Sequence, residues 1–244
     1  MHFHLPKPLH GWREFAGEVG IIVVGVLIAL AFEAIVEDWQ WHEKSRRAVD
    51  ALRPELAANF LYATEMASTV PCADQQLASL ENRVANSGAT LNPAPNYSEA
   101  IYARYTIRAP SREWPDQVWQ AMVVEGVSSH LDPALRRRLA RAYNLLGMNR
   151  ATNHGTDEIA YRLQLLARPV PLDPASRNHL IEEIEEARGD FDDMKLRSEQ
   201  AIKMIALSGL APAQRDVDAA LKVSGTVKFC RAHGIALGKA GPQD

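Results

Sequence analysis

The sequence predicts an all-α protein in which one N-terminal transmembrane helix continues into an antiparallel helical bundle. Residues 19–32 are apolar and uncharged, and the apolar run extends to Val36. From Leu180 to Ile205 apolar or small residues recur in steps of four and three, a spacing typical of packed helices. We divide the 244 residues into a tail, 1–11, a transmembrane helix, 12–38, and a helical bundle domain, 39–244.

The apolar run is long enough to cross a membrane. Residues 19–32 would extend about 21 Å as a helix and residues 19–36 about 27 Å, against a hydrocarbon layer of about 30 Å. Three tryptophans flank the run and predict interfacial anchors: Trp12, Trp39 and Trp41. Two alternatives remain open. Ala29-Leu30-Ala31 formally matches a signal-peptidase site, although the segment before it carries Glu14 and Glu18, and a buried core helix would also be apolar.

The preceding tail is predicted to be extended, because Pro6 and Pro8 interrupt any helix. His2 and His4 lack a third ligand nearby, so we expect no metal site.

One face of the predicted transmembrane helix suggests association with another helix. Its members are two small residues and two carboxylates at helical spacing: Glu18, Gly25, Ala29 and Glu33. Small residues allow close helix approach, and an intramembrane carboxylate favours a partner over lipid. The alternative is that Glu18 and Glu33 mark the two interfaces and reach water.

Orientation and cysteine content together favour an inner-membrane protein with a cytoplasmic N-terminus and a periplasmic bundle. Basic residues are nearly balanced across the span, but its C-terminal side begins with Glu37 and Asp38. The two cysteines, Cys72 and Cys230, match no metal or redox spacing and are candidates for a disulfide, which would persist in an oxidising compartment. Two separate buried thiols are the alternative.

Several helices are predicted in the first half of the bundle domain. We expect a helix over 39–69, kinked or restarted at Pro54, and a new helix opened by Pro71 and ended near Gly88. Residues 92–98 are a loop that includes a formal glycosylation acceptor, Asn96-Tyr97-Ser98, and 101–107 are a helix or extended link. Ser111 then caps a helix that carries Trp114, Val118 and Met122 and ends at Gly126.

The second half begins with a helix start at Asp132-Pro133. Its basic face is either solvated or contacts lipid head groups or an acidic partner, and consists of Arg136, Arg137, Arg138 and Arg141. Asn153-His154-Gly155 should loosen or break this helix before it resumes at Ile159–Leu166. A turn over 168–174 leads into the regular helix that ends at Gly209, and a helix over 213–222 and a segment around Phe229 follow.

No enzyme class has its sequence signature here. Nucleophile-elbow, zinc-protease, dinucleotide and P-loop patterns are missing from the sequence, and no Glu-x-x-His pair suggests a di-iron bundle. The net charge of −3 gives no basic field for nucleic acid. We therefore expect no catalytic residues, no cofactor and no nucleic-acid partner.

The first forty residues resemble a family of bacterial single-span membrane proteins of unknown function. The resemblance rests on LPKPLHGWREF at 5–15 and GEVGII at 17–22, with looser similarity near Trp119 and at 138–143. It implies an N-terminal anchor and a helical domain, and neither an activity nor catalytic residues.

These observations lead to one main functional hypothesis, a non-enzymatic accessory or assembly subunit of a membrane complex. Its partners would be membrane lipid and either other membrane subunits or a second copy of the chain. The alternative is a sensor-like bundle that binds a small ligand near Trp114, Trp119 and Tyr143. A hydrolase with dispersed residues is a third hypothesis.

Overall fold

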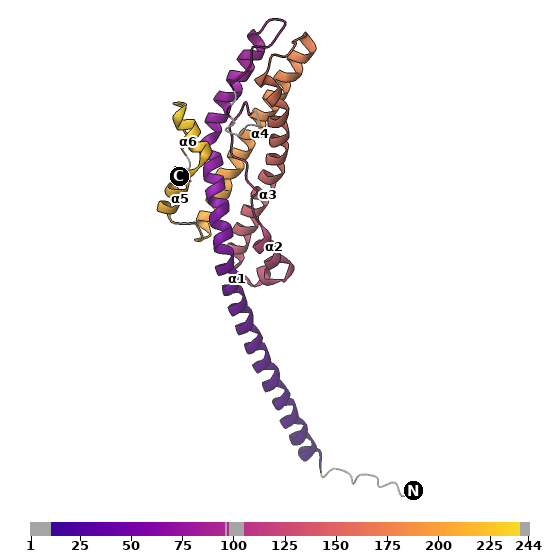
Figure 1. Ribbon diagram of the computed structural model, residues 1–244. Helices are drawn as coiled ribbons and strands as arrows, with labels where there is room; N and C mark the ends of the chain where they lie inside the picture. Colours follow the sequence, from indigo (N-terminus) through magenta and orange to yellow (C-terminus); the bar gives the residue numbers. More distant parts are fainter. Residues whose placement is uncertain (1–10, 96, 98–104, 240–244) are drawn as a thin grey trace, which may run out of the picture.

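The all-α prediction is confirmed by a computed structural model that describes residues 11–95, 97 and 105–239 (Figure 1). The described parts contain six α-helices and two 3₁₀ helices and no strand: α1 Gly11–Asn86, α2 Gln117–Val124, η1 Val127–His130, α3 Pro133–Arg162, η2 Leu163–Ala167, α4 Pro174–Leu207, α5 Gln214–Val223 and α6 Gly225–Ala232. The predicted tail, with His2 and His4, lies outside the described residues except for Gly11.

Helix α1 is one continuous helix of 76 residues, so the expected break before Pro71 is wrong. At 1.5 Å per residue it extends about 114 Å. Pro54 and Pro71 each remove one helical hydrogen bond, but the buried residues on both sides of them, such as Leu52, Leu56, Val70 and Ala73, keep the helix in register. At Pro71 the C-terminal segment adds a bond, because the amide of Gly238 donates to the carbonyl of Ser68 at 2.8 Å.

Helices α1, α3 and α4 form the bundle, in which α4 packs along both of the others and runs antiparallel to each. Arg177, near the start of α4, donates to the carbonyl of Ser87 just beyond the end of α1 at 2.8 Å. At the opposite end Arg138, near the start of α3, donates to the carbonyl of Leu207, the last residue of α4, at 2.7 Å. The predicted seam of α4 is buried, from Ile184 through Phe191 and Met194 to Ile205.

The predicted N-caps of α3 and α4, Asp132 and Asp173, are confirmed. The Asp132 carboxylate accepts from the amides of Ala134 and Leu135, both at 2.9 Å, and Asp173 accepts from Ser176 at 2.8 Å. Gly209, with φ of 75°, follows the end of α4 as expected.

Two other boundary predictions are wrong. Ser111 caps no helix, since α2 begins only at Gln117, and Trp114 lies in the preceding irregular segment with φ of 54°. Helix α3 runs through Asn153-His154-Gly155, because Asn153, Thr156 and Ile159 continue its buried face and outweigh the low helix propensity of glycine.

The connection between α1 and α2 is irregular where it is described. Asn96 and Ser98 of the glycosylation acceptor lie outside the described residues, as does 101–104 of the predicted link. From Tyr105 to Asp116 the chain runs alongside α3, from the Thr106 hydroxyl, which donates to the Leu163 carbonyl at 3.1 Å, to Asp116, which pairs with Arg150 at 3.0 Å.

The two C-terminal helices, α5 and α6, pack against α1 (Figure 1), and the first turn of α6 also faces the 105–112 segment. Their buried residues include Val217, Val227 and Cys230. Helix α1 is therefore covered by other elements from Trp41 onward and stands alone before it.

Candidate functional site: the apolar segment of α1 and the bundle that it carries

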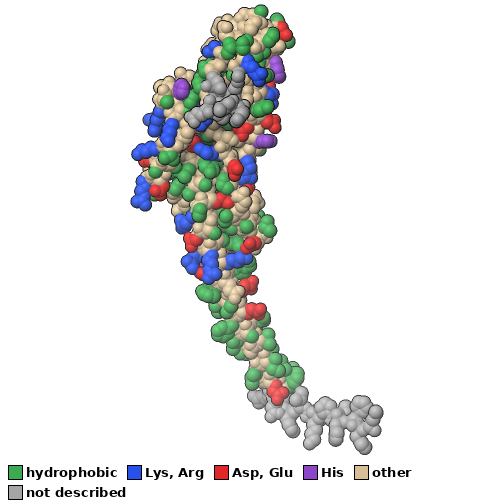
Figure 2. Space-filling view, viewed as in Figure 1, with side chains coloured by type: hydrophobic (Ala, Val, Ile, Leu, Met, Phe, Trp, Pro, Cys, Tyr) green, Lys and Arg blue, Asp and Glu red, His purple; other side chains and the backbone are tan. Residues whose placement is uncertain are grey.

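The apolar segment of α1, residues 15–39, has its side chains exposed on every face. Ile21, Leu30 and Ile35 are 76%, 55% and 65% exposed, and no described residue of another element packs against them (Figure 2). Among the described residues, α1 is the one helix long and apolar enough to cross a membrane. In water this apolar surface would stay hydrated at a large free-energy cost, and contact with lipid removes that cost.

The residues predicted to associate with another helix are all uncovered. Glu18, Gly25, Ala29 and Glu33 are exposed, and a Cβ atom added at Gly25 would meet nothing within 4 Å. The structure thus keeps this face available and brings no described residue of the same chain to it.

The three predicted interfacial anchors lie in two different environments. Trp12 and Trp39 are 80% and 68% exposed. Trp41 stacks on His130 of η1 with ring centroids 3.9 Å apart, and the Lys44 ammonium next to it pairs with Glu125 at 3.3 Å. The bundle therefore begins at Trp41, directly beyond the apolar segment.

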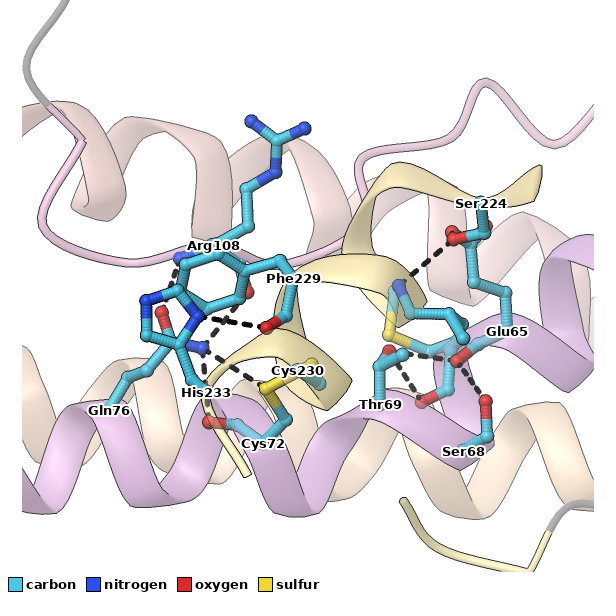
Figure 3. The surroundings of a disulfide bond; sticks show 12 residues. Glu65, Ser68, Thr69, Cys72, Gln76, Arg108, Ser224, Phe229, Cys230 and His233 are labelled. Carbon is cyan, nitrogen blue, oxygen red and sulfur yellow. Dashed lines mark hydrogen bonds between the residues drawn. A yellow bond between two sulfur atoms is a disulfide. The ribbon is translucent and has the colours of Figure 1, made fainter. Parts of the chain in front are cut away.

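Cys72 of α1 and Cys230 of α6 form a disulfide across a sequence separation of 158, and both cysteines are fully buried (Figure 3). Beside it, the Gln76 side-chain amide donates to the Cys72 and Arg108 carbonyls at 3.0 and 3.1 Å, and its oxygen accepts from the Arg108 amide at 2.6 Å. Gln76 thereby fixes the 105–112 segment to α1 next to the sulfur atoms.

Buried Glu65 adds a second connection among the same elements. It accepts from the Arg112 guanidinium at 2.8 Å and from the Ser224 hydroxyl, the N-cap of α6, at 2.5 Å. The disulfide and the Ser224 hydrogen bond therefore hold α6 on α1, whereas the Arg112–Glu65 ion pair and the Gln76 hydrogen bonds hold the 105–112 segment there.

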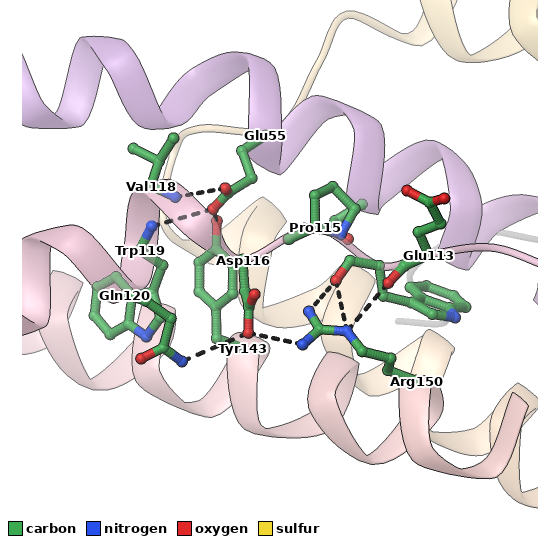
Figure 4. Close-up of polar contacts among 11 residues, drawn as sticks. Glu55, Glu113, Pro115, Asp116, Val118, Trp119, Gln120, Tyr143 and Arg150 are labelled. Carbon is green, nitrogen blue, oxygen red and sulfur yellow. Dashed lines mark hydrogen bonds and ion pairs between the residues drawn. The ribbon is translucent and has the colours of Figure 1, made fainter. Parts of the chain in front are cut away.

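A second buried carboxylate, Glu55, joins α1 to α2 and α3 (Figure 4). It accepts from the amides of Val118 and Trp119 at 2.7 and 3.2 Å and from the Tyr143 hydroxyl at 2.7 Å. Burial, and then the bond to Glu55, raise the pKa of Tyr143. Sequence reasoning missed Glu55, although a single glutamate between apolar positions of a predicted core helix was an available signal.

The aromatic side chains proposed to border a ligand pocket belong to this buried layer. Trp119 stacks on Tyr143 with centroids 5.2 Å apart, and Trp114 is fully buried. Next to them the Arg150 guanidinium binds the Trp114 carbonyl and pairs with Asp116 at 3.0 Å. Trp114, Trp119 and Tyr143 are thus part of the buried core of the bundle.

A cavity of about 580 Å³ lies elsewhere, between the 105–112 segment, α3 and the first turn of α6. Its polar wall includes Ser111 and Asn153, which donate to one oxygen of the Asp157 carboxylate at 2.8 and 3.1 Å. Its apolar wall includes Ile107 and Phe191. Cavities of this size accommodate small organic ligands.

No group of three or more histidine, cysteine, aspartate or glutamate side chains suited to a metal ion occurs in the described part of the chain. Comparison of the chain with protein-family models, curated proteins and solved structures found no match. The resemblance of the first forty residues to bacterial single-span proteins therefore stays a prediction.

Proposed function

We propose that the protein is a non-enzymatic, membrane-anchored accessory or assembly subunit of a membrane protein complex. The observation that carries this proposal is the exposed apolar segment of α1, which continues without interruption into a packed bundle. An uninterrupted helix fixes the bundle rigidly above the membrane and leaves the intramembrane face free for other helices.

The proposed topology is a single pass through the inner membrane, with the N-terminus in the cytoplasm and the bundle in the periplasm. A buried disulfide supports this compartment, because disulfides persist in oxidising environments and are rare in the cytosol. The acidic residues that follow the span, Glu37 and Asp38, agree with the same orientation.

The proposed contact with partner subunits uses the face of Glu18, Gly25, Ala29 and Glu33. Small residues on this face permit another helix to approach closely, and the open space at Gly25 is compatible with such contact. The partner is another membrane subunit or a second copy of the chain.

The experiment is affinity purification of the tagged full-length chain from its native membranes in mild detergent. We expect a membrane protein to be recovered at fixed stoichiometry, or a homodimer, and Gly25→Leu to reduce that recovery several-fold. Ala31→Leu is the matched control, since Ala31 lies two residues from Ala29 and hence on the opposite side of the helix. Equal recovery with both variants would contradict the proposed contact.

Anchoring itself is tested by ultracentrifugation without detergent. We expect the full-length chain in the membrane pellet, resistant to carbonate extraction. Recovery in the supernatant would refute the whole proposal.

The second candidate is a sensor-like bundle that binds a small ligand, and the cavity of about 580 Å³ favours it. In this case the purified protein would carry a small molecule detectable by native mass spectrometry. Thr156→Trp, placed in the cavity wall, should then abolish the bound species while Gly25→Leu leaves it unchanged.

A further inference from the structure

The cavity of about 580 Å³ is lined by two charged side chains that have no ionic partner within the described part of the chain. Its charged residues are Arg108, Arg112 and Asp157. Arg112 pairs with buried Glu65 at 2.6 Å. Arg108 and Asp157 form no ion pair with each other or with any other residue that the structure describes. One cavity therefore presents a separate positive group and a separate negative group.

The Asp157 carboxylate is held in place through one of its two oxygens. Ser111 and Asn153 donate to that oxygen at 2.8 and 3.1 Å. The second oxygen accepts from no donor in the described part of the chain, and the residue is exposed. Asp157 is therefore an oriented acceptor with an oxygen available to an ammonium group.

The Arg108 guanidinium is held at another part of the wall, beside the first turn of α6. Its backbone is bonded twice to the Gln76 side chain, at 2.6 and 3.1 Å, and its own side chain extends away from Gln76 and the disulfide (Figure 3). A Cβ atom added at Gly225 would meet Nη2 of Arg108 at 3.1 Å, so the missing side chain leaves room for the guanidinium. A guanidinium in this position can bind a carboxylate through two parallel hydrogen bonds.

The two charged groups are spaced along a segment without helix, residues 105–116. Arg108 comes three residues before Ser111, the residue that holds the carboxylate. Three extended residues span at most about 11 Å, which limits the distance between these two backbone positions. The same cavity is also lined by the apolar side chains of Ile107 and Phe191, which are 7% and 3% exposed. Its wall therefore suits a ligand with a positive end, a negative end and a small apolar part.

We propose that this cavity binds a small zwitterion, a free amino acid or a short peptide, with its carboxylate on Arg108 and its ammonium group on Asp157. The inference deepens the second candidate function, a ligand-binding bundle, and rests on it. A ligand with one charge would leave the opposite side chain of the cavity unpaired, whereas a zwitterion pairs both. The charged ends of an amino acid are about 3.5 Å apart and those of an extended tripeptide about 10 Å, and both lengths lie within the limit set by the segment.

The test begins with ligand capture by the full-length chain, purified in detergent and dialysed. The chain is incubated with a mixture of the standard amino acids and, separately, with a random tripeptide library that has free termini. Molecules that stay bound after the free ones are removed are identified by mass spectrometry. The retained species is then compared with its C-terminal amide and its N-acetyl form by isothermal titration calorimetry. We expect each modification to weaken binding by about tenfold or more, because each removes one charge-assisted contact.

Two variants of the chain assign the two contacts. Arg108→Gln should bind the free ligand and its amide with equal affinity, and Asp157→Asn should bind the free ligand and its N-acetyl form with equal affinity. Arg136→Gln and Asp192→Asn are the matched controls, because they remove exposed charges of α3 and α4 outside the cavity, and they should keep both preferences. Comparing ligands on one variant separates the loss of a contact from the loss of the fold, since a misfolded chain would bind none of them.

The outcomes separate this inference from the candidate function on which it rests. Retention of an amino acid or of a tripeptide, with both preferences, supports the inference and identifies which of the two the cavity takes. A retained ligand whose amide or N-acetyl form binds equally well overturns the zwitterion. Retention of nothing from either mixture by a chain that carries a different small molecule also overturns the zwitterion, but keeps the ligand-binding function. A chain that carries no molecule and retains none overturns both.

Discussion

At the scale of single residues, Glu55 has the largest predicted effect on stability. The residue is 8% exposed, and its carboxylate accepts from two amides at the start of α2 and from the Tyr143 hydroxyl. Glu55→Ala leaves these three donors buried without an acceptor, which should lower the free energy of unfolding by about 3 kcal/mol. Urea unfolding of the detergent-solubilised chain, followed by circular dichroism, measures this change.

Asp50→Ala is the control for Glu55. It removes a carboxylate from the same helix, but Asp50 is exposed and pairs with exposed Arg53 at 3.3 Å, so its loss should change stability by less than about 0.5 kcal/mol. Comparable losses of unfolding free energy in the two variants would contradict a stabilising role of the Glu55 network.

Asp190 provides a pH-dependent prediction at the same scale. Burial, together with the neighbouring carboxylates of Glu186 and Asp193, raises its pKa above the ordinary value of 3.8. The folded chain then binds a proton at Asp190 more tightly than the unfolded chain, so this residue makes stability fall as pH rises from 3.8 through the folded-state pKa. Asp190→Asn should therefore raise the thermal midpoint at pH 7, and the gain should shrink toward pH 3.

The matched substitution for Asp190 is Asp192→Asn, on the exposed side of the same helix. It should leave the dependence of the thermal midpoint on pH close to that of the unchanged chain. A gain from Asp190→Asn that is constant across pH would rule out titration of this carboxyl as its cause.

At the scale of elements, Pro54 offers a test of how α1 tolerates prolines. Pro54 lies inside α1 and is exposed, so Pro54→Ala restores a backbone donor without removing buried contacts. Alanine is more favourable than proline in a helix interior by about 3 kcal/mol. Removing proline also raises the conformational entropy of the unfolded chain, which offsets about 1 kcal/mol of this gain. We expect a net gain of about 2 kcal/mol in chemical unfolding.

Pro174→Ala is the comparison for Pro54→Ala. Pro174 occupies the first turn of α4, where the amide has no helical acceptor, and its replacement should have little effect. An equal gain at both positions would mean that the benefit does not come from the restored hydrogen bond.

The elements also show which features the sequence can and cannot predict. Capping by Asp132 and Asp173 and the seam of α4 were predictable, because these depend on neighbours within one helix. The continuity of α1 through Pro71, and that of α3 through Gly155, depend on packing by distant segments. The same holds for the Glu55 network, whose residues come from three parts of the chain: α1, α2 and α3.

At the scale of the whole molecule, the disulfide and Glu65 hold α5 and α6 on α1. Replacement of Cys72 and Cys230 by alanine should reduce stability, by at most about 5 kcal/mol in the chain-entropy model for a loop of this length. It should also speed hydrogen exchange of residues 214–232 more than that of α4. Mass spectrometry of the alkylated, non-reduced native chain checks the premise, and two labelled thiols would contradict it.

The same covalent link has a consequence for the fate of the protein under proteolysis. A single cut anywhere between Cys72 and Cys230 divides the backbone into two fragments, yet the sulfur bridge keeps both in one covalent molecule. Since Cys72 belongs to the helix that carries the apolar segment, the C-terminal fragment of a nicked chain would stay attached to that segment until a reductant releases it.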